Sequence, residues 1–464
     1  MYSDLVNIVL PKIQAYWSQL LQVNQAIGNL TFARTCTSIW GNGVCAAVLP
    51  TETCGAITIN PKYLAATQVC ASSSTSGCNT LAGGPGVSGD IVIFTSAQAG
   101  ASGAPCGPGS STIAYASPCI LSSNDRPVAG LLNFCPGVLT NLYGRLNGTT
   151  PQAPNSYNNL ISVVVHEMTH ILAYSSSLFA FYRDENGNPR TPRSSNGQPP
   201  QDSTGAYIAS PNTTLITTTE RGYTVQKIIL PNVLARARAQ FGCPTLNGVE
   251  IEHAGSSGTA GSHPTSRLWP FDYMAGALHT GASIDMNAVT LAHFQDSGWY
   301  QVNYDLAINS RFGYSAGCDF AMKPCLNTPA GTALAIPTDP NSFCNSTTGS
   351  IVCVNQRTAS GVCGVFTGQT IPSLYRYFTP VYGSPTGDGM GGSDPLMDYC
   401  PFLSTAAYSS STTGDCRFTM NSLNAQQSQA LETPTWIHPL TSRGLLLSGH
   451  LSSQRNPVLG PRWI

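Results

Sequence analysis

The chain has 464 residues, of which 21 are basic and 22 are acidic, so its formal net charge is -1. Such a balance provides no overall field that would recruit nucleic acid or an anionic membrane, and neither is an expected partner. Only 9% of the residues are charged, against roughly a quarter in an ordinary globular protein. We therefore expect a polar but largely uncharged surface, and the length predicts two or three subdomains rather than one simple core.

Sixteen cysteines are scattered singly rather than in CxxC pairs, which favours disulfides formed in an oxidising compartment over zinc ribbons. Four N-glycosylation sequons agree with that compartment and begin at Asn29, Asn147, Asn212 and Asn345. No run reaches the roughly 20 apolar residues of a membrane span, the first residues are not a signal peptide, and the last are not a lipid-anchor tail. We expect a secreted or cell-surface protein whose ends were trimmed or whose gene model is incomplete.

Two features are predicted in the first third of the chain. Residues 1–23 have the pattern of an amphipathic helix interrupted by Pro11. Residues 34–125 are rich in Cys, Gly, Ser and Thr and contain a strand-like run, Asp90–Ala97, with the sequence DIVIFTSA. This second region is predicted to be a sheet stapled by disulfides.

The longest helical pattern covers Ser156–Tyr182 and is predicted to be the central buried helix. Loop-like sequence then continues to about Ser210, and a second helix is predicted at Leu230–Cys243. Beyond Tyr304 cysteines are frequent and helical pattern is scarce, which indicates a separate domain held by disulfides.

Two histidines and a glutamate lie within the apolar part of the central helix, in the sequence VVVHEMTHIL. His166 and His170 are four residues apart, so on a helix they project from one face and can bind one ion. Glu167 is placed to take a proton from a water made acidic by zinc. With eight histidines and seven glutamates in the chain, the pattern H-E-x-x-H is expected by chance only about 0.002 times. A hydrogen-bonded core cluster is the weaker interpretation, because burying these groups without a cation is costly.

A third protein ligand is required, and local spacing does not supply it, because no histidine lies six residues beyond His170 and the third residue beyond it is Ala173. His438 and His450 lie in an unpatterned tail, where a solvated role is expected. The open candidates are four histidines and three glutamates: His253, His263, His279, His293, Glu220, Glu250 and Glu252.

Several blocks in the right order give the chain a specific resemblance to the leishmanolysin family of zinc metalloproteases, a branch of the metzincins. Besides the zinc helix, these blocks are Ser117–Pro136, Phe241–His263, Asp296–Tyr304, Gly317–Cys325 and Leu396–Phe402. The resemblance implies an α+β, metzincin-type fold with a mixed sheet, a central active-site helix, a long insertion and a loop-rich, disulfide-held C-terminal domain. The expected divisions are a catalytic subdomain at 1–173, a central subdomain at 174–303 and a Cys-rich domain at 304–464.

The resemblance also implies roles for individual residues. His263 becomes the third ligand of one catalytic Zn²⁺, with His166 and His170, and Met274 becomes the Met-turn methionine beneath the metal. Glu167 becomes the general base of an endopeptidase whose protein or peptide substrate pairs with an edge strand. The run Asp90–Ala97 is the candidate strand of that sheet, and the low charge of the surface favours subsite pockets over electrostatic steering.

The chain departs from the family pattern in three ways. Ala173 stands where the motif has Gly, and a positive φ there would cost about 1–2 kcal/mol. After His263 the residues Pro264–Arg267 replace bulky and charged ones, which is expected to alter the wall of the cleft. No propeptide with a zinc-blocking cysteine is found.

Two rival functions follow from the same residues. One is a catalytically silent cell-surface adhesion or binding protein that retains the zinc site, against which the intact Glu167 argues. The other is a zinc protease whose third ligand is a glutamate. The sequence leaves the oligomeric state, the pairing of the cysteines and the cleavage specificity open.

Overall fold

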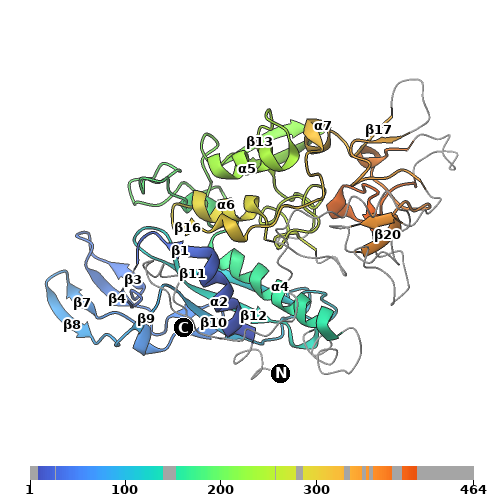
Figure 1. Ribbon diagram of the computed structural model, residues 1–464. Helices are drawn as coiled ribbons and strands as arrows, with labels where there is room; N and C mark the ends of the chain where they lie inside the picture. Colours follow the sequence, from blue (N-terminus) through green and yellow to red (C-terminus); the bar gives the residue numbers. More distant parts are fainter. Residues whose placement is uncertain are drawn as a thin grey trace, which may run out of the picture. The chain divides into compact units, whose positions relative to one another are not determined.

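The computed structural model describes residues 9–404, apart from residue 27 and the segments 139–152, 256–257, 278–285, 329–334, 347–351, 355–358 and 379–388. Helices and small sheets of two or three strands alternate along these residues (Figure 1). The backbone forms two units. The first contains the chain up to Ala209 together with Phe294–Asn303, and the second contains Ser210–His293 and the chain from Tyr304.

The first unit opens with helix α2, Leu10–Leu20, which buries Ile13, Trp17 and Leu20. Pro11 occupies the first turn of this helix, where its missing N–H costs no hydrogen bond. Strand β1, Leu21–Val23, follows directly and pairs antiparallel with β16, Tyr300–Val302. Residues 1–8 of the predicted helix lie outside the described residues.

The predicted disulfide-stapled sheet region is confirmed as four small antiparallel pairs. These pairs are β2 (Asn29–Leu30) with β9 (Val87–Ser88), β3 (Cys36–Ile39) with β4 (Cys45–Val48), β5 (Thr53–Cys54) with β6 (Ile57–Thr58), and β7 (Thr67–Ser73) with β8 (Ser76–Leu81). Disulfides link Cys36 to Cys45, Cys54 to Cys119, Cys70 to Cys78, and Cys106 to Cys135.

A three-stranded sheet lies under the central helix (Figure 1). Its middle strand, β12 (Pro127–Phe134), is buried at every residue and runs parallel to β10 (Val92–Ser96) and antiparallel to β11 (Ala114–Leu121). The strand predicted at Asp90–Ala97 is thus confirmed as β10. The helix approaches β12 so closely that a Cβ on Gly130 would lie 2.3 Å from Ile171 Cγ2, so only glycine fits there.

The central helix, α4, covers Ala153–Leu172 and therefore ends ten residues before the predicted Tyr182. Its last turn widens, because the amides of both Ala173 and Tyr174 donate to the carbonyl of Thr169, and three serines that compete for backbone hydrogen bonds follow. The hydroxyls of Tyr300 and Tyr182 donate to the carbonyls of Leu172 and Ala173 and so satisfy the helix end. A short 3-10 helix, η3 (Phe179–Phe181), occupies part of the remaining predicted span.

Ala173 is not among the residues with positive φ. The strain expected from placing alanine at the glycine position of the motif is therefore absent, because the helix leaves without a left-handed residue there.

The second unit begins with a hairpin that the sequence patterns did not predict. Strands β13 (Leu215–Glu220) and β14 (Tyr223–Ile228) are joined by Arg221 and Gly222, whose φ values of 52° and 89° belong to a tight two-residue turn. β14 also pairs with β15, Val249–Glu250. Helix α5, Pro231–Phe241, lies between β14 and β15 in the sequence and confirms the predicted second helix. It ends at Gly242, which has the left-handed conformation.

The rest of this unit is loop-rich, as predicted. Its elements are α6 (Ala288–Asp296), η4 (Tyr304–Leu306), α7 (Gly317–Met322), β17 (Leu326–Asn327), β18 (Ile336–Pro337), β19 (Val352–Val354), β20 (Ala359–Cys363), η6 (Ser373–Tyr375), η7 (Pro395–Met397) and β21 (Leu403–Ser404), although the last residues of α6 belong to the first unit. Disulfides link Cys243 to Cys318, Cys325 to Cys400, and Cys344 to Cys363. None of the helices in the described parts of the chain has the length and apolar character needed to cross a bilayer.

Candidate metal centre

The helical spacing of the motif brings two imidazoles together on one face of α4. The rings of His166 and His170 have centroids 4.8 Å apart and are nearly perpendicular, and their Nε2 atoms are 3.1 Å apart. Two ligands of one zinc ion, each about 2.0–2.1 Å from it, lie at a separation of this order. The pair therefore has the spacing that a shared cation requires.

The end of α4 determines which ring nitrogen of His170 can bind a cation. Nδ1 of His170 lies 2.7 Å from the carbonyl oxygen of Tyr174. A carbonyl can only accept, so Nδ1 carries the proton and the lone pair remains on Nε2. Because α4 ends early, the carbonyl of Tyr174 lies beside Nδ1 of His170 and leaves the Nε2 lone pair available to bind a cation.

His263 lies on a loop of the second unit, and its Nδ1 is likewise bound by a backbone carbonyl. It is 4% exposed, and its Nδ1 lies 2.8 Å from the carbonyl oxygen of Thr259, which again leaves Nε2 for a cation. One ligand atom from each of His166, His170 and His263 lies within 4.8 Å of the others. Three neutral imidazole nitrogens are a donor set that suits zinc, so these residues fit the ion that the motif indicates.

Glu167 is buried beside this group, with 8% of its surface exposed. Burial raises the pKa of Glu167 to about 8, because desolvation disfavours the carboxylate. A divalent cation close to this side chain would lower that pKa again by favouring the charged form.

The segment around Met274 packs against the loop that carries His263. Met274 is 0% exposed, and its amide donates to Asp272 Oδ1 at 2.8 Å. A Cβ on Gly276 would lie 2.6 Å from Thr259 Cγ2 and 3.8 Å from His263 Cγ, so the backbone of this turn passes directly beside the imidazole. Asp272 also accepts a hydrogen bond from Thr290 at 2.9 Å, which fixes the turn to the start of α6.

The three candidate glutamates are engaged elsewhere. Glu252 accepts three hydrogen bonds from backbone amides, and Glu250 forms ion pairs with Arg221 and Arg267. Glu220 pairs with Lys227.

The two other candidate histidines that the structure describes, His253 and His293, are not part of the group of three. Nε2 of His253 lies 3.0 Å from the hydroxyl of Tyr375. His293 is 1% exposed, and burial lowers its pKa to about 3. His279 lies outside the described residues, as do His438 and His450.

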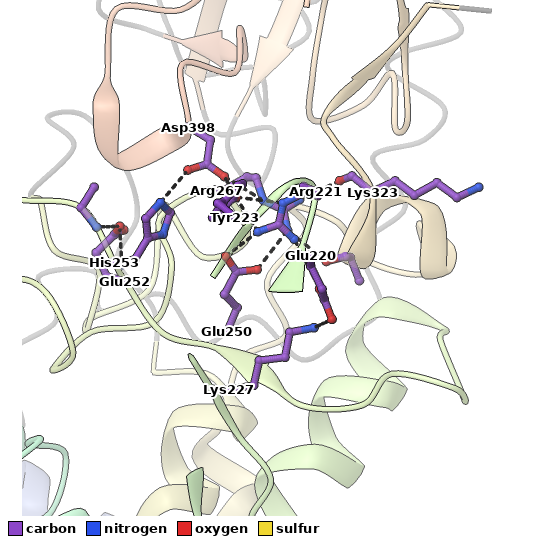
Figure 2. A network of polar contacts seen from close by, with 12 residues as sticks. Glu220, Arg221, Tyr223, Lys227, Glu250, Glu252, His253, Arg267, Lys323 and Asp398 are labelled. Carbon is purple, nitrogen blue, oxygen red and sulfur yellow. Dashed lines mark hydrogen bonds and ion pairs between the residues drawn. The ribbon is translucent and has the colours of Figure 1, made fainter. Parts of the chain in front are cut away.

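Residues Pro264–Arg267, which were expected to alter the wall of the cleft, are buried. Thr265, Ser266 and Arg267 are each 0% exposed. Arg267 instead belongs to a polar network within the second unit, which Figure 2 shows in detail.

The polar network is a set of paired buried charges that the sequence patterns did not predict. Arg221 Nη2 lies 2.5 Å from Glu250 Oε1, and Arg267 lies 3.5 Å from both Glu250 Oε2 and Asp398 Oδ2 (Figure 2). The hydroxyl of Tyr223 donates to Asp398 Oδ2 at 2.6 Å. Against the opposing effect of burial, Arg267 and Arg221 together lower the pKa of Glu250, whereas burial raises the pKa of Asp398.

The described residues thus combine a mixed α and β architecture, seven disulfides and a largely buried group of three imidazoles, two of which come from an H-E-x-x-H helix. This combination is typical of proteins with a zinc-type histidine site, and the three histidines could hold a metal ion.

Comparisons with known proteins identify the family within that class. The model of the leishmanolysin family, peptidase family M8, matches residues 206–437. The chain is 30% identical over 467 residues to a leishmanolysin-like peptidase of Drosophila pseudoobscura pseudoobscura, covering 93% of this chain and 65% of the relative. A leishmanolysin-like peptidase of Caenorhabditis briggsae is 31% identical over 426 residues, with 85% and 61% covered. Leishmanolysin of Leishmania major is 28% identical over 292 residues, with 63% and 39% covered.

The chain belongs to the leishmanolysin family of metallopeptidases. It spans just under two thirds of the length of the Drosophila relative, at 65%.

Proposed function

We propose that this protein is a zinc-dependent endopeptidase with a metzincin-type catalytic fold. The observation that carries the proposal is the group formed by His166, His170 and His263, each with a ligand atom within 4.8 Å of the others. The family membership supports it, because the similar proteins of Drosophila and Caenorhabditis are leishmanolysin-like peptidases. The three-part division at residues 173 and 303 remains part of this proposal.

In the proposed mechanism, His166, His170 and His263 would hold a zinc ion, which would act as a Lewis acid by making water more acidic and polarising a peptide carbonyl. Glu167 accepts the proton that the attacking water loses and delivers it to the leaving amine. The backbone carbonyls of Tyr174 and Thr259 hold the Nδ1 protons of two ligands, which keeps their Nε2 lone pairs available. Met274 provides an apolar floor and does not bind the ion.

The substrate is proposed to be an extended peptide that adds to an edge of the three-stranded sheet. β10, from the predicted run Asp90–Ala97, and β11 occupy the two ends of the strand order β10-β12-β11. Both therefore qualify as the edge, and the substrate would run antiparallel to the strand it pairs with.

An extracellular or cell-surface location is part of the proposal. The seven disulfides within the described part of the chain support an oxidising compartment. Of the four sequons, Asn29, Asn212 and Asn345 lie in the described residues and Asn147 does not. Glycosylation at these positions, like any membrane attachment, remains a proposal.

The test compares the oxidised wild-type protein with Glu167→Ala, in cleavage of a denatured protein with and without a chelator. Wild-type cleavage that stops with the chelator, together with a silent variant that keeps its zinc, would support the proposal. The rival adhesion or binding function predicts no cleavage by either protein. Equal cleavage by both would refute the role of Glu167.

A further inference from the structure

The loop that carries His263 is closed at its base by one buried residue, Glu252. Its amide donates to the carbonyl of His263 at 2.8 Å, and its own carbonyl accepts from the amide of Gly261 at 2.8 Å. Two backbone hydrogen bonds thus join the start of this loop to its end. We call this junction, formed by Glu252–Ala254 and Gly261–Ser266, the neck.

The buried carboxylate of Glu252 stabilises the neck by accepting hydrogen bonds from backbone amides on both sides of the loop (Figure 2). Oε1 accepts from the amides of His253 and Ala254 at 3.1 and 3.0 Å, on the outgoing side of the loop. Oε2 accepts from the amide of Ser266 at 3.0 Å, on the returning side. Glu252 is only 1% exposed and Ser266 is 0% exposed, so water does not replace the bond between them, and the buried amide of Ser266 depends on this acceptor.

The position of the imidazole follows from the neck. The carbonyl of His263 is fixed by Glu252, and its ring is fixed within the same loop by the carbonyl of Thr259. A loop ordered before the ion arrives binds it more tightly, because no ordering entropy remains to be lost.

We propose that Glu252 is the positioning residue of the third metal ligand, which it holds through the neck without touching the ion. The inference rests on the proposed function in one respect, namely that His263 is a ligand.

The first test uses the wild-type chain without metal, because the neck should be formed before zinc binds. Hydrogen exchange, followed by mass spectrometry of peptides spanning residues 252–266, should show these amides protected about tenfold or more over an unstructured chain. Adding zinc should change that protection little. Rapid exchange in the metal-free protein, with protection appearing only on zinc addition, would overturn the inference.

The second test uses Glu252→Gln, which keeps the side-chain size but replaces one acceptor oxygen with an NH₂ group. Competition with a chromogenic chelator should show zinc binding weakened about 10–100-fold, as for other groups that orient a ligand. Glu52→Gln is the matched control, because Glu52 is also a buried carboxylate that accepts a backbone amide, that of Thr35 at 2.6 Å. It should leave zinc affinity unchanged even where it lowers the urea midpoint.

A double-mutant cycle that combines Glu252→Gln with His263→Ala separates an effect on the position of His263 from a general loss of stability. In that background Glu252→Gln should have little further effect on zinc affinity. An effect as large as in the wild-type background would contradict the inference, as would unchanged affinity in the single variant. Should Glu252→Gln fail to fold, the exchange measurement still decides the matter. A wild-type chain that binds no zinc would refute the proposed function. The hydrogen-exchange measurement on the metal-free chain tests the neck independently of that result.

Discussion

The buried charges of the second unit predict a large loss of stability when Arg267 is replaced by Met. The guanidinium is 0% exposed and donates to the carbonyls of Phe320, Ala321 and Lys323 at 3.1, 3.0 and 3.3 Å. It also lies 3.5 Å from carboxylate oxygens of both Glu250 and Asp398 (Figure 2). Arg267 therefore ties the end of α7 to two buried acids.

The size of the effect follows from what the substitution leaves behind. Glu250 keeps Arg221, but Asp398, which is 1% exposed, loses its arginine, and three carbonyls lose a donor. Removing one partner of a buried ion pair costs about 3–5 kcal/mol. The matched control is Lys323→Met, because Lys323 pairs with Asp319 at 2.8 Å while 55% of its side chain is exposed. An exposed pair of this spacing contributes about 0.3–0.5 kcal/mol.

Urea unfolding of the two variants, followed by circular dichroism and read as free energies at equal m-values, provides the assay. Arg267→Met should lose at least about 3 kcal/mol more than Lys323→Met. A loss within about 1 kcal/mol of the control would show that the network contributes no more than surface pairs, and the reasoning would be refuted.

Three further predictions concern other parts of the molecule. Burial lowers the pKa of His293 to about 3, from about 6.5 in the unfolded chain, so the contribution of the neutral imidazole to the free energy of unfolding is complete above pH 6.5 and is lost as the pH falls. Between pH 7 and pH 5 the wild type should therefore lose about 2 kcal/mol more of this free energy than His293→Leu, and equal losses would contradict the prediction. Replacing Cys243 and Cys318, which are 75 residues apart, with Ser should cost about 4 kcal/mol by chain entropy in urea unfolding, and an unchanged midpoint would show that this link does not constrain the unfolded chain. Cleavage of a neutral peptide should change less than about twofold between 50 mM and 300 mM salt, and a steep fall would show electrostatic steering.

Local patterns in the sequence predicted the elements that depend on neighbouring residues. Pairing of His166 with His170 follows from helical periodicity alone, and β10 follows from an apolar run between turns. The predicted end of α4 is wrong in part because the carbonyl of Leu172 accepts a hydrogen bond from the hydroxyl of Tyr300, which is 128 residues away in the sequence.

The hairpin of β13 and β14 had a local signal that was missed. Its strands are rich in Thr, Ile, Val and Tyr and flank Arg221 and Gly222, a two-residue turn with glycine in second place. Missing it also meant missing Tyr223 and Lys227, two members of the polar network that this hairpin carries.

The third imidazole could not be predicted from local spacing. Chemistry alone left seven candidates open, and only the family resemblance favoured His263 among them. The structure supports that choice in physical terms, because Glu250 and Glu252 have their oxygens engaged by arginines and backbone amides. Pairings such as Tyr223 with Asp398, which are 175 residues apart, have no local signal at all.

The most direct test of the central claim is the zinc content of the purified wild-type chain and of His263→Ala, measured by atomic absorption after dialysis against a weak chelator. The account predicts about one zinc ion per wild-type chain and a large loss in the variant, because two imidazoles of one helix turn hold zinc less tightly than three. A His263→Ala protein that keeps one zinc ion at wild-type affinity would contradict it.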